Sequence, residues 1–139
     1  MEKNNRTDYG NEPFIVNIES ASCENPYYRR ILWTGDDLQV SLMSIPIGDE
    51  VGLERHPDND QFIRIENGCA QVQMGNSAEN LNIQNRVNSS YAVMVPAGVW
   101  HNIKNIGNVP LKIYTIYAPP HHPKGTVHET RKIAEAAED

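Results

Sequence analysis

The sequence predicts an all-β protein with a single domain of the sandwich or barrel type. Short runs of β-branched and aromatic residues recur along the chain, separated by turn residues such as Gly, Pro, Asn and Asp. Several runs alternate apolar and polar residues, which is the period of a strand with one buried face. No helical period of useful length precedes Glu129, and 139 residues are enough for one core but not two.

The first part of the chain contains an arm and three predicted strands. Polar residues without periodicity open the chain, so residues 1–12 are expected to form a flexible arm. Strands are predicted at 14–18, 28–34 and 38–45, because these runs are rich in β-branched and apolar residues. The third run alternates apolar and polar residues until Pro46 ends it.

The second part continues the same rhythm. Asn67-Gly68 is a strong signal for a two-residue hairpin, so the strands on either side are expected to pair antiparallel. Strands are predicted at 61–66, 69–74, 81–87, 91–95, 100–105 and 111–117. Good helix formers fill 130–137, which forms either a short helix or a frayed tail. We expect one barrel domain over 13–120 and a C-terminal extension over 121–139.

Composition limits the classes of partner and the location. The formal net charge is -6 and the pI is about 5.3, which argues against nucleic acid or an anionic membrane as a partner. No apolar run approaches the length of a membrane span, and Met1 leads into polar residues rather than a signal peptide, so a cytoplasmic location is expected. Cys23 and Cys69 form no C-x-x-C pair and are expected to be structural or bystander residues.

Two segments contain the residues that are best suited to bind a metal ion or take part in a reaction. In the first segment Gly48 is followed by Glu54, His56, Gln61 and Gly68. In the second segment Ser90 is followed by Pro96, Gly98, His101 and Asn105. At these spacings the chain resembles the cupin superfamily, whose two motifs are G(X)5HXH(X)3,4E(X)6G and G(X)5PXG(X)2H(X)3N. Three positions differ from the motifs: Glu54 replaces a His, Gln61 replaces a Glu, and Ser90 replaces a Gly.

The resemblance implies a fold, a metal site and an assembly. Cupins are double-stranded β-helices, or jelly-roll barrels, that commonly form homodimers and often hold a metal ion inside the barrel. Residues 118–128 also resemble a group of small bacterial cupins. The phosphomannose isomerases, a distant likeness, also replace one of the expected histidines with a side-chain oxygen donor, as Glu54 does here.

Strand geometry predicts that the candidate ligands share one interior. Residues two apart in a strand point to the same side, so Glu54 and His56 share a face. Gln61 shares its face with apolar Ile63, and His101 shares its face with apolar Ile103, which indicates that both point inward. We therefore expect a metal site formed by Glu54, His56, Gln61 and His101. The alternative, an exposed strand charge at Glu54 and a surface amide at Gln61, stays open.

The chemistry of this set suits a divalent ion. Two imidazoles and one carboxylate form the ligand set of non-haem Fe(II) oxygenases, which leaves coordination positions open. Mn, Ni, Co and Zn are also compatible with it. The amide oxygen of Gln61 would be a weak, neutral fourth ligand. Such an ion polarises a carbonyl group or lowers the pKa of bound water.

Three functions are compatible with these residues. The first is a metal-dependent enzyme for a small polar metabolite, performing either isomerisation of a sugar or keto acid or oxygenase chemistry, with no catalytic residue assigned. The second is a non-catalytic barrel that binds a sugar-like molecule, and the third is a metal-stabilised structural barrel. His121 and His122 either cross the barrel mouth and add a proton donor or lie in a solvated linker, and the sequence favours the linker.

Overall fold

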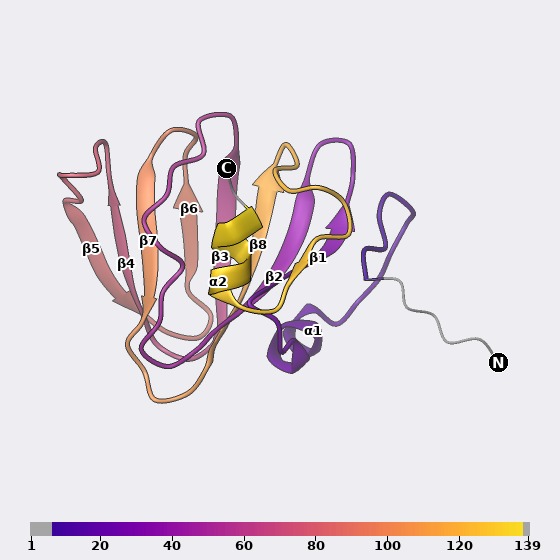
Figure 1. Cartoon of the computed structure of the whole chain (residues 1–139), viewed down its shortest axis with the longest axis horizontal. Helices are drawn as coiled ribbons and strands as arrows, with labels where there is room; N and C mark the ends of the chain where they lie inside the picture. The colour runs from indigo at the N-terminus through magenta and orange to yellow at the C-terminus, as the bar shows by residue number, and fades with distance from the viewer. Residues whose placement is uncertain (1–6, 138–139) are drawn as a thin grey trace.

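The computed structural model describes residues 7–137, which form two β-sheets that face each other (Figure 1). One sheet has six strands in the order β6-β3-β8-β2-β1-β9, and the other has three in the order β5-β4-β7. Within the described residues the two sheets do not join into one closed barrel. The predicted all-β, double-stranded β-helix class is confirmed, with a short helix at the C-terminal end.

Eight of the nine predicted strands are present with small changes in their bounds, and α1 and β9 are additional elements. In chain order the elements are α1 (Ile18–Glu24), β1 (Arg29–Thr34), β2 (Gln39–Ile45), β3 (Asp60–Asn67), β4 (Ala70–Gly75), β5 (Ile83–Val87), β6 (Ala92–Val95), β7 (Trp100–Asn105), β8 (Leu111–Ala118), β9 (Val127–His128) and α2 (Arg131–Ala137). Of the two options for residues 130–137, the structure has the helix. None of the helices found between residues 7 and 137 is long and apolar enough to cross a membrane.

The strand predicted at 14–18 is wrong, and helix α1 was missed. Ile15 is 99% exposed and lies in no strand. Asn17 is the N-cap of α1, and its side chain accepts a hydrogen bond from the Ser20 backbone N–H at 3.0 Å. The helix has only seven residues, which is too short to show a helical period in the sequence.

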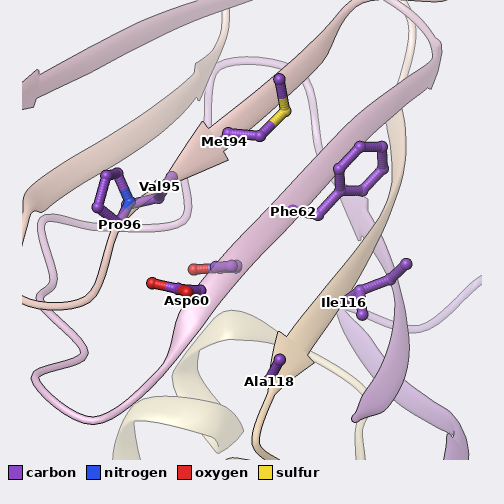
Figure 2. A pocket seen from close by; sticks show the side chains of 8 residues that line it. Asp60, Phe62, Met94, Val95, Pro96, Ile116 and Ala118 are labelled. Atoms are coloured by element: carbon purple, nitrogen blue, oxygen red, sulfur yellow. The ribbon is translucent and has the colours of Figure 1, made fainter.

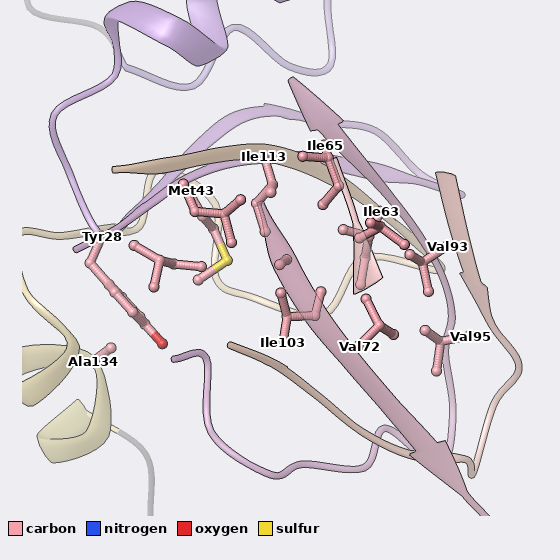
Figure 3. Packing of buried hydrophobic residues seen from close by; sticks show 14 residues of the cluster. Tyr28, Met43, Ile63, Ile65, Val72, Val93, Val95, Ile103, Ile113 and Ala134 are labelled. Atoms are coloured by element: carbon pink, nitrogen blue, oxygen red, sulfur yellow. The ribbon is translucent and has the colours of Figure 1, made fainter. Parts of the chain in front are cut away.

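The core lies between the two sheets. Ile63, Ile65 and Ile113 of the six-stranded sheet point toward Val72 and Ile103 of the three-stranded sheet (Figure 3). β3, β4 and β8 alternate buried and less buried residues over most of their length, so one face of each sheet enters the core. The opposite face of each sheet points away from this core.

The turn at Asn67-Gly68 is present, but the predicted antiparallel pairing across it is wrong. β3 pairs with β6 and β8, whereas β4 pairs with β5 and β7, so the chain crosses from one sheet to the other at this turn. Gly68 has φ +107, and a Cβ atom there would lie 3.1 Å from a Leu111 side-chain carbon. Glycine therefore satisfies both the left-handed backbone and the close approach of β8.

Part of the expected flexible arm is firmly attached. Residues 1–6 of it lie outside the described residues, but Asp8 is buried. Its carboxylate accepts hydrogen bonds from the Thr34 hydroxyl and from backbone N–H groups of Thr34, Gly10 and Gly125. Burial alone would raise the pKa of Asp8, but these hydrogen bonds lower it below its ordinary value. Residues 7–10 therefore pack against the fold, residues 11 and 12 are exposed, and the flexibility of the arm stays a prediction.

Candidate metal centre

Three side chains from the two motif segments converge at one point between the sheets. One ligand atom from each of Glu54, His56 and His101 lies within 4.8 Å of the others. Glu54 Oε1 is 3.2 Å from His56 Nε2 and 3.5 Å from His101 Nε2. The two imidazole ring centroids are 5.3 Å apart. This spacing allows all three groups to reach a single ion.

Backbone pairing brings these distant residues together. The Glu54 N–H donates to the His101 carbonyl at 3.0 Å, and the His101 N–H donates to the Glu54 carbonyl at 2.9 Å. The Gly98 N–H donates to the His56 carbonyl at 2.9 Å, so the two segments are joined at both histidines. Gly98 has φ +86, which favours glycine in the turn that leads into β7. The site is therefore held by main-chain hydrogen bonds.

The orientation of the histidines favours metal ligation. Nδ1 of His101 lies 3.1 Å from the Val99 carbonyl, which can only accept, so in a neutral ring Nδ1 carries the proton and Nε2 has the free lone pair. Both Nε2 atoms are buried, and within the described structure each approaches Oε1 of Glu54 without the geometry of a hydrogen bond. Buried polar atoms normally have a partner, and an ion would satisfy both. The residues present therefore fit a divalent metal ion.

The carboxylate of Glu54 is held in its charged form. Burial alone would raise its pKa, but the close approach of His101 and His56 lowers the pKa below its ordinary value. A carboxylate must be deprotonated to bind a metal. The environment of Glu54 therefore supplies the protonation state that ligation needs.

Gln61 lies in the interior beside this cluster. It is 6% exposed, and its Oε1 atom has no hydrogen-bond partner within the described residues. On β3 it pairs with Val95 on one side and Tyr117 on the other, and both of these residues are buried. The edge of the Tyr117 ring contacts His56, with ring centroids 5.6 Å apart. Direct ligation by Gln61 stays a prediction, which this placement supports.

The segment that carries His121 and His122 packs against the site, so the linker interpretation is wrong. The His121 ring contacts His56 with centroids 4.3 Å apart, and the His122 ring contacts Tyr117 at 5.2 Å. Gln39, which is 0% exposed, fastens this segment. Its Oε1 accepts from the backbone N–H groups of His121 and His122, and its Nε2 donates to the His122 carbonyl. We call residues 119–126 the histidine strap.

Sequence reasoning missed Gln39 and the buried Arg29 beside the strap. Gln39 shares its strand face with Ser41 and Met43, and all three are buried. A polar side chain on the buried face of a strand must find hydrogen-bond partners, and that is the signal the sequence offered. Its partners at His121 and His122 lie far along the chain, so the sequence did not identify them.

We predict that acid destabilises the protein through His122. Burial, then the charges of Arg29 and His121, lower its pKa from 6.5 to about 3, so the folded state keeps this ring neutral. In the unfolded chain His122 takes up a proton near pH 6.5, so above that pH its titration does not reduce the free energy of unfolding. The free energy of unfolding falls as the pH decreases toward 3, by up to about 1.4 kcal/mol per unit.

Urea denaturation at several pH values between 5 and 7 would measure this slope above the range in which carboxylates titrate. The variant His122→Gln should show a shallower slope than the wild type. Burial also lowers the pKa of His121 and of His128, so part of the slope should persist in the variant. Identical slopes in the two proteins would contradict the assignment to His122.

A second hollow lies on the outer face of the six-stranded sheet (Figure 2). Met94, Phe62 and Ile116 project from three neighbouring strands, and the hollow has a volume of about 370 Å³. Met94 is 63% exposed. Neighbours in a strand point to opposite faces, so the side chains of Phe62 and Gln61 point to opposite sides of β3. The lining of the hollow is mostly apolar and also includes Asp60 and Gln61.

Comparison with a family model agrees with the geometry. The model described as Cupin domain matches residues 41–117, which include all four predicted ligands. The matched range runs from β2 to β8 and so includes both motif segments.

Relatives show the same similarity over most of the chain. The uncharacterized protein YrkC of Bacillus subtilis (strain 168) is 57% identical over 132 residues, which are 95% of this chain and 71% of that protein. The crystal structure of BH2720 from Bacillus halodurans superposes with a TM-score of 0.94 at 58% identity and covers 94% of this chain and 99% of that one. KdgF from Halomonas sp. superposes with a TM-score of 0.59 at 17% identity, covers 67% of this chain and 80% of that one, and shares the fold alone.

Proposed function

This chain belongs to the cupin family, and on that premise we propose that it is a metal-dependent enzyme acting on a small polar metabolite. One observation carries the proposal. Two buried imidazole nitrogens without a hydrogen-bond partner lie beside a carboxylate whose pKa is lowered, at ion-pair distances of 3.2 and 3.5 Å. Both nitrogens share one carboxylate oxygen without hydrogen-bond geometry, and an ion placed among the three groups would give each of them a full partner.

The proposed ligands are Glu54, His56 and His101, with Gln61 as a neutral fourth donor. A divalent ion held by one carboxylate keeps a net positive charge, and it would polarise a carbonyl group or lower the pKa of bound water. The chain itself orients His101 through Val99, keeps Glu54 charged and covers the site with the histidine strap. These features support either isomerisation of a sugar or keto acid or oxygenase chemistry.

Metal content is the experiment that tests the proposal. Protein purified without a tag and without chelator should contain close to one divalent ion per chain by plasma mass spectrometry. Iron would favour oxygenase chemistry, because two histidines and one carboxylate are the ligand set of non-haem Fe(II) oxygenases. Protein that holds no ion even after anaerobic reloading would contradict the proposal, and metabolite binding without metal would then favour the non-catalytic barrel.

The homodimer implied by the cupin resemblance stays a prediction. The apolar side chains of Phe62, Met94 and Ile116 on the outer sheet face support it, because such residues favour burial against a partner (Figure 2). The small-molecule partner and the cytoplasmic location also stay predictions.

A further inference from the structure

Arg29 is a buried cation without a carboxylate partner. Its side chain lies opposite Met43 of the core in β2, and the residue is 2% exposed. Among the described residues no carboxylate forms an ion pair with it, and its Nε atom has no hydrogen-bond partner. Its Nη1 atom lies 3.3 Å from Nδ1 of His128. Arginine keeps its proton in proteins, so a full positive charge is buried here.

Such a charge is expensive in free energy. Taking an ion out of water costs several kcal/mol unless an opposite charge and good hydrogen bonds offset that cost. The groups in direct contact with Arg29 supply no opposite charge: the Tyr28 ring lies 5.4 Å from its guanidinium carbon, and the pKa values of His128 and His122 are lowered, from burial first and then from the charge of Arg29. The carboxylate of Glu54 lines the same cavity but forms no ion pair with Arg29. Where a local rule of stability is broken in this way, a functional site is expected.

A cavity of about 160 Å³ is lined both by this cation and by Glu54 of the candidate metal cluster. Its polar lining also includes Tyr28, Arg131 and Glu135, and Glu135 is paired with Arg131. Ligand pockets for larger molecules typically measure about 300–1,000 Å³, so this one suits a metabolite of only a few carbon atoms. Glu54 therefore belongs both to the cluster that would bind the ion and to the wall of the cavity.

The two arginines of the cavity differ in what they can still bind. Arg131 donates from Nη1 to Asp49 at 2.9 Å and from Nε to Glu135 at 3.1 Å, so nearby carboxylates already neutralise it. Arg29 has no such partner in the described part of the chain. The unsatisfied positive charge of the cavity thus lies at Arg29.

We propose that this cavity binds a small 2-oxo or 2-hydroxy carboxylate. The carboxylate group of the ligand would pair with Arg29, and the oxygen on the second carbon of the ligand would point toward Glu54. The inference rests on the proposed function, and within it favours an organic acid over a sugar. A neutral sugar would leave the buried charge of Arg29 uncompensated, whereas a carboxylate matches the planar guanidinium by two parallel hydrogen bonds. A phosphate is less well suited, because it carries more charge than one free arginine offsets.

Pyruvate binding, measured by isothermal titration calorimetry, tests the inference. The proteins are the wild type, Arg29→Met and Arg30→Met, each in a chelator-treated and a Mn(II)-loaded form. Arg29→Met removes the charge but keeps an apolar stem, and we expect it to weaken pyruvate binding by about tenfold or more. Arg30 is the next residue of β1 and donates to the Thr7 carbonyl, so Arg30→Met should bind pyruvate as the wild type does.

The ligand series separates charge from shape. Pyruvamide has the shape of pyruvate without the charge and should bind about tenfold more weakly or worse. Equal binding of the two ligands, wild-type affinity in Arg29→Met, tighter binding of inorganic phosphate than of pyruvate, or no pyruvate binding at all would each overturn the inference.

The design distinguishes this inference from the proposed function. Glu54 repels a carboxylate until a cation neutralises it, so Mn(II) loading should strengthen pyruvate binding. Binding that depends on Arg29 but does not respond to Mn(II) supports the inference and counts against the metal-dependent function. Stoichiometric metal content together with unchanged pyruvate binding in Arg29→Met supports the metal-dependent function and counts against the inference.

Thermal unfolding gives a second readout. If Arg29 had only a structural role, Arg29→Met would destabilise the fold, as breaking a buried pair does. For a binding residue with no internal counter-ion, we expect the melting temperature without ligand to stay the same or rise. A large decrease in that temperature together with unchanged pyruvate affinity would overturn the inference.

Discussion

Replacing His101 with alanine is expected to remove stoichiometric metal from the protein while the two sheets stay folded. His101 is 2% exposed, its Nε2 atom has no hydrogen-bond partner, and its Nδ1 atom is oriented by the Val99 carbonyl. Loss of residues that only support a ligand typically costs about 10–100-fold in metal affinity, so loss of a direct ligand should cost more. Plasma mass spectrometry of the variant and the wild type, purified side by side, measures the effect.

Two further variants make this result decisive. Glu54→Gln keeps the size of the side chain and the backbone pairing with β7 but removes the charge, so it should also lose the metal. Lys104→Ala changes β7 on the face opposite to His101 and should keep the metal. Circular dichroism checks that each variant is folded. A folded His101→Ala protein with full metal content would refute the site.

Replacing Gln39 with alanine is expected to lower the free energy of unfolding by about 3 kcal/mol and to loosen the histidine strap. The fully buried amide accepts hydrogen bonds of 3.1 and 2.9 Å from the His121 and His122 backbone and donates at 2.8 Å to the His122 carbonyl and at 3.0 Å to the Thr34 hydroxyl. Alanine would leave these groups without partners, and unpaired buried groups cost about 1–3 kcal/mol each. Water that enters the space would offset part of this cost.

Hydrogen exchange shows whether the loss is local. Amide protons in residues 119–126 of Gln39→Ala should exchange faster than in the wild type, because the clamp that orders them is gone. Gln84→Ala is the matched control, since the Gln84 amide makes its hydrogen bonds with Gln71, Gln73 and Leu81 at the exposed surface. This control should change stability by no more than about 0.5 kcal/mol. Equal effects of the two substitutions would contradict a specific role for Gln39.

The strands could be predicted because each one has its own local pattern. Residues 111–117 alternate apolar and polar side chains, and the structure has β8 there, with buried and half-buried residues in alternation. The segment 14–18 carries the same type of residues but forms no strand, because a strand also needs a neighbour with which to pair. Pairing partners lie far along the chain, and local composition does not name them.

The convergence of Glu54, His56 and His101 was predictable for a different reason. The spacing of Glu54, His56 and His101 resembles a family motif, and the motif carries the three-dimensional arrangement with it. No such motif covers Gln39, His121 or Arg29, so their roles could not be read in this way. The linker interpretation of His121 failed because proline-rich composition is typical of solvated segments, whereas buried hydrogen bonds to Gln39 determine where this one lies.

The sequence by itself determined the all-β class, most of the strands, the C-terminal helix as one of two options, and the residues that could bind a metal. Only the tertiary structure decided that the chain changes sheets at Gly68, that Asp8 and Gln39 fasten distant segments, and that Arg29 is buried without a counter-ion. The physical reason is the range of the interactions. Periodicity and turn chemistry act between neighbours in the chain, whereas hydrogen-bond satisfaction and charge burial depend on groups that only folding brings together.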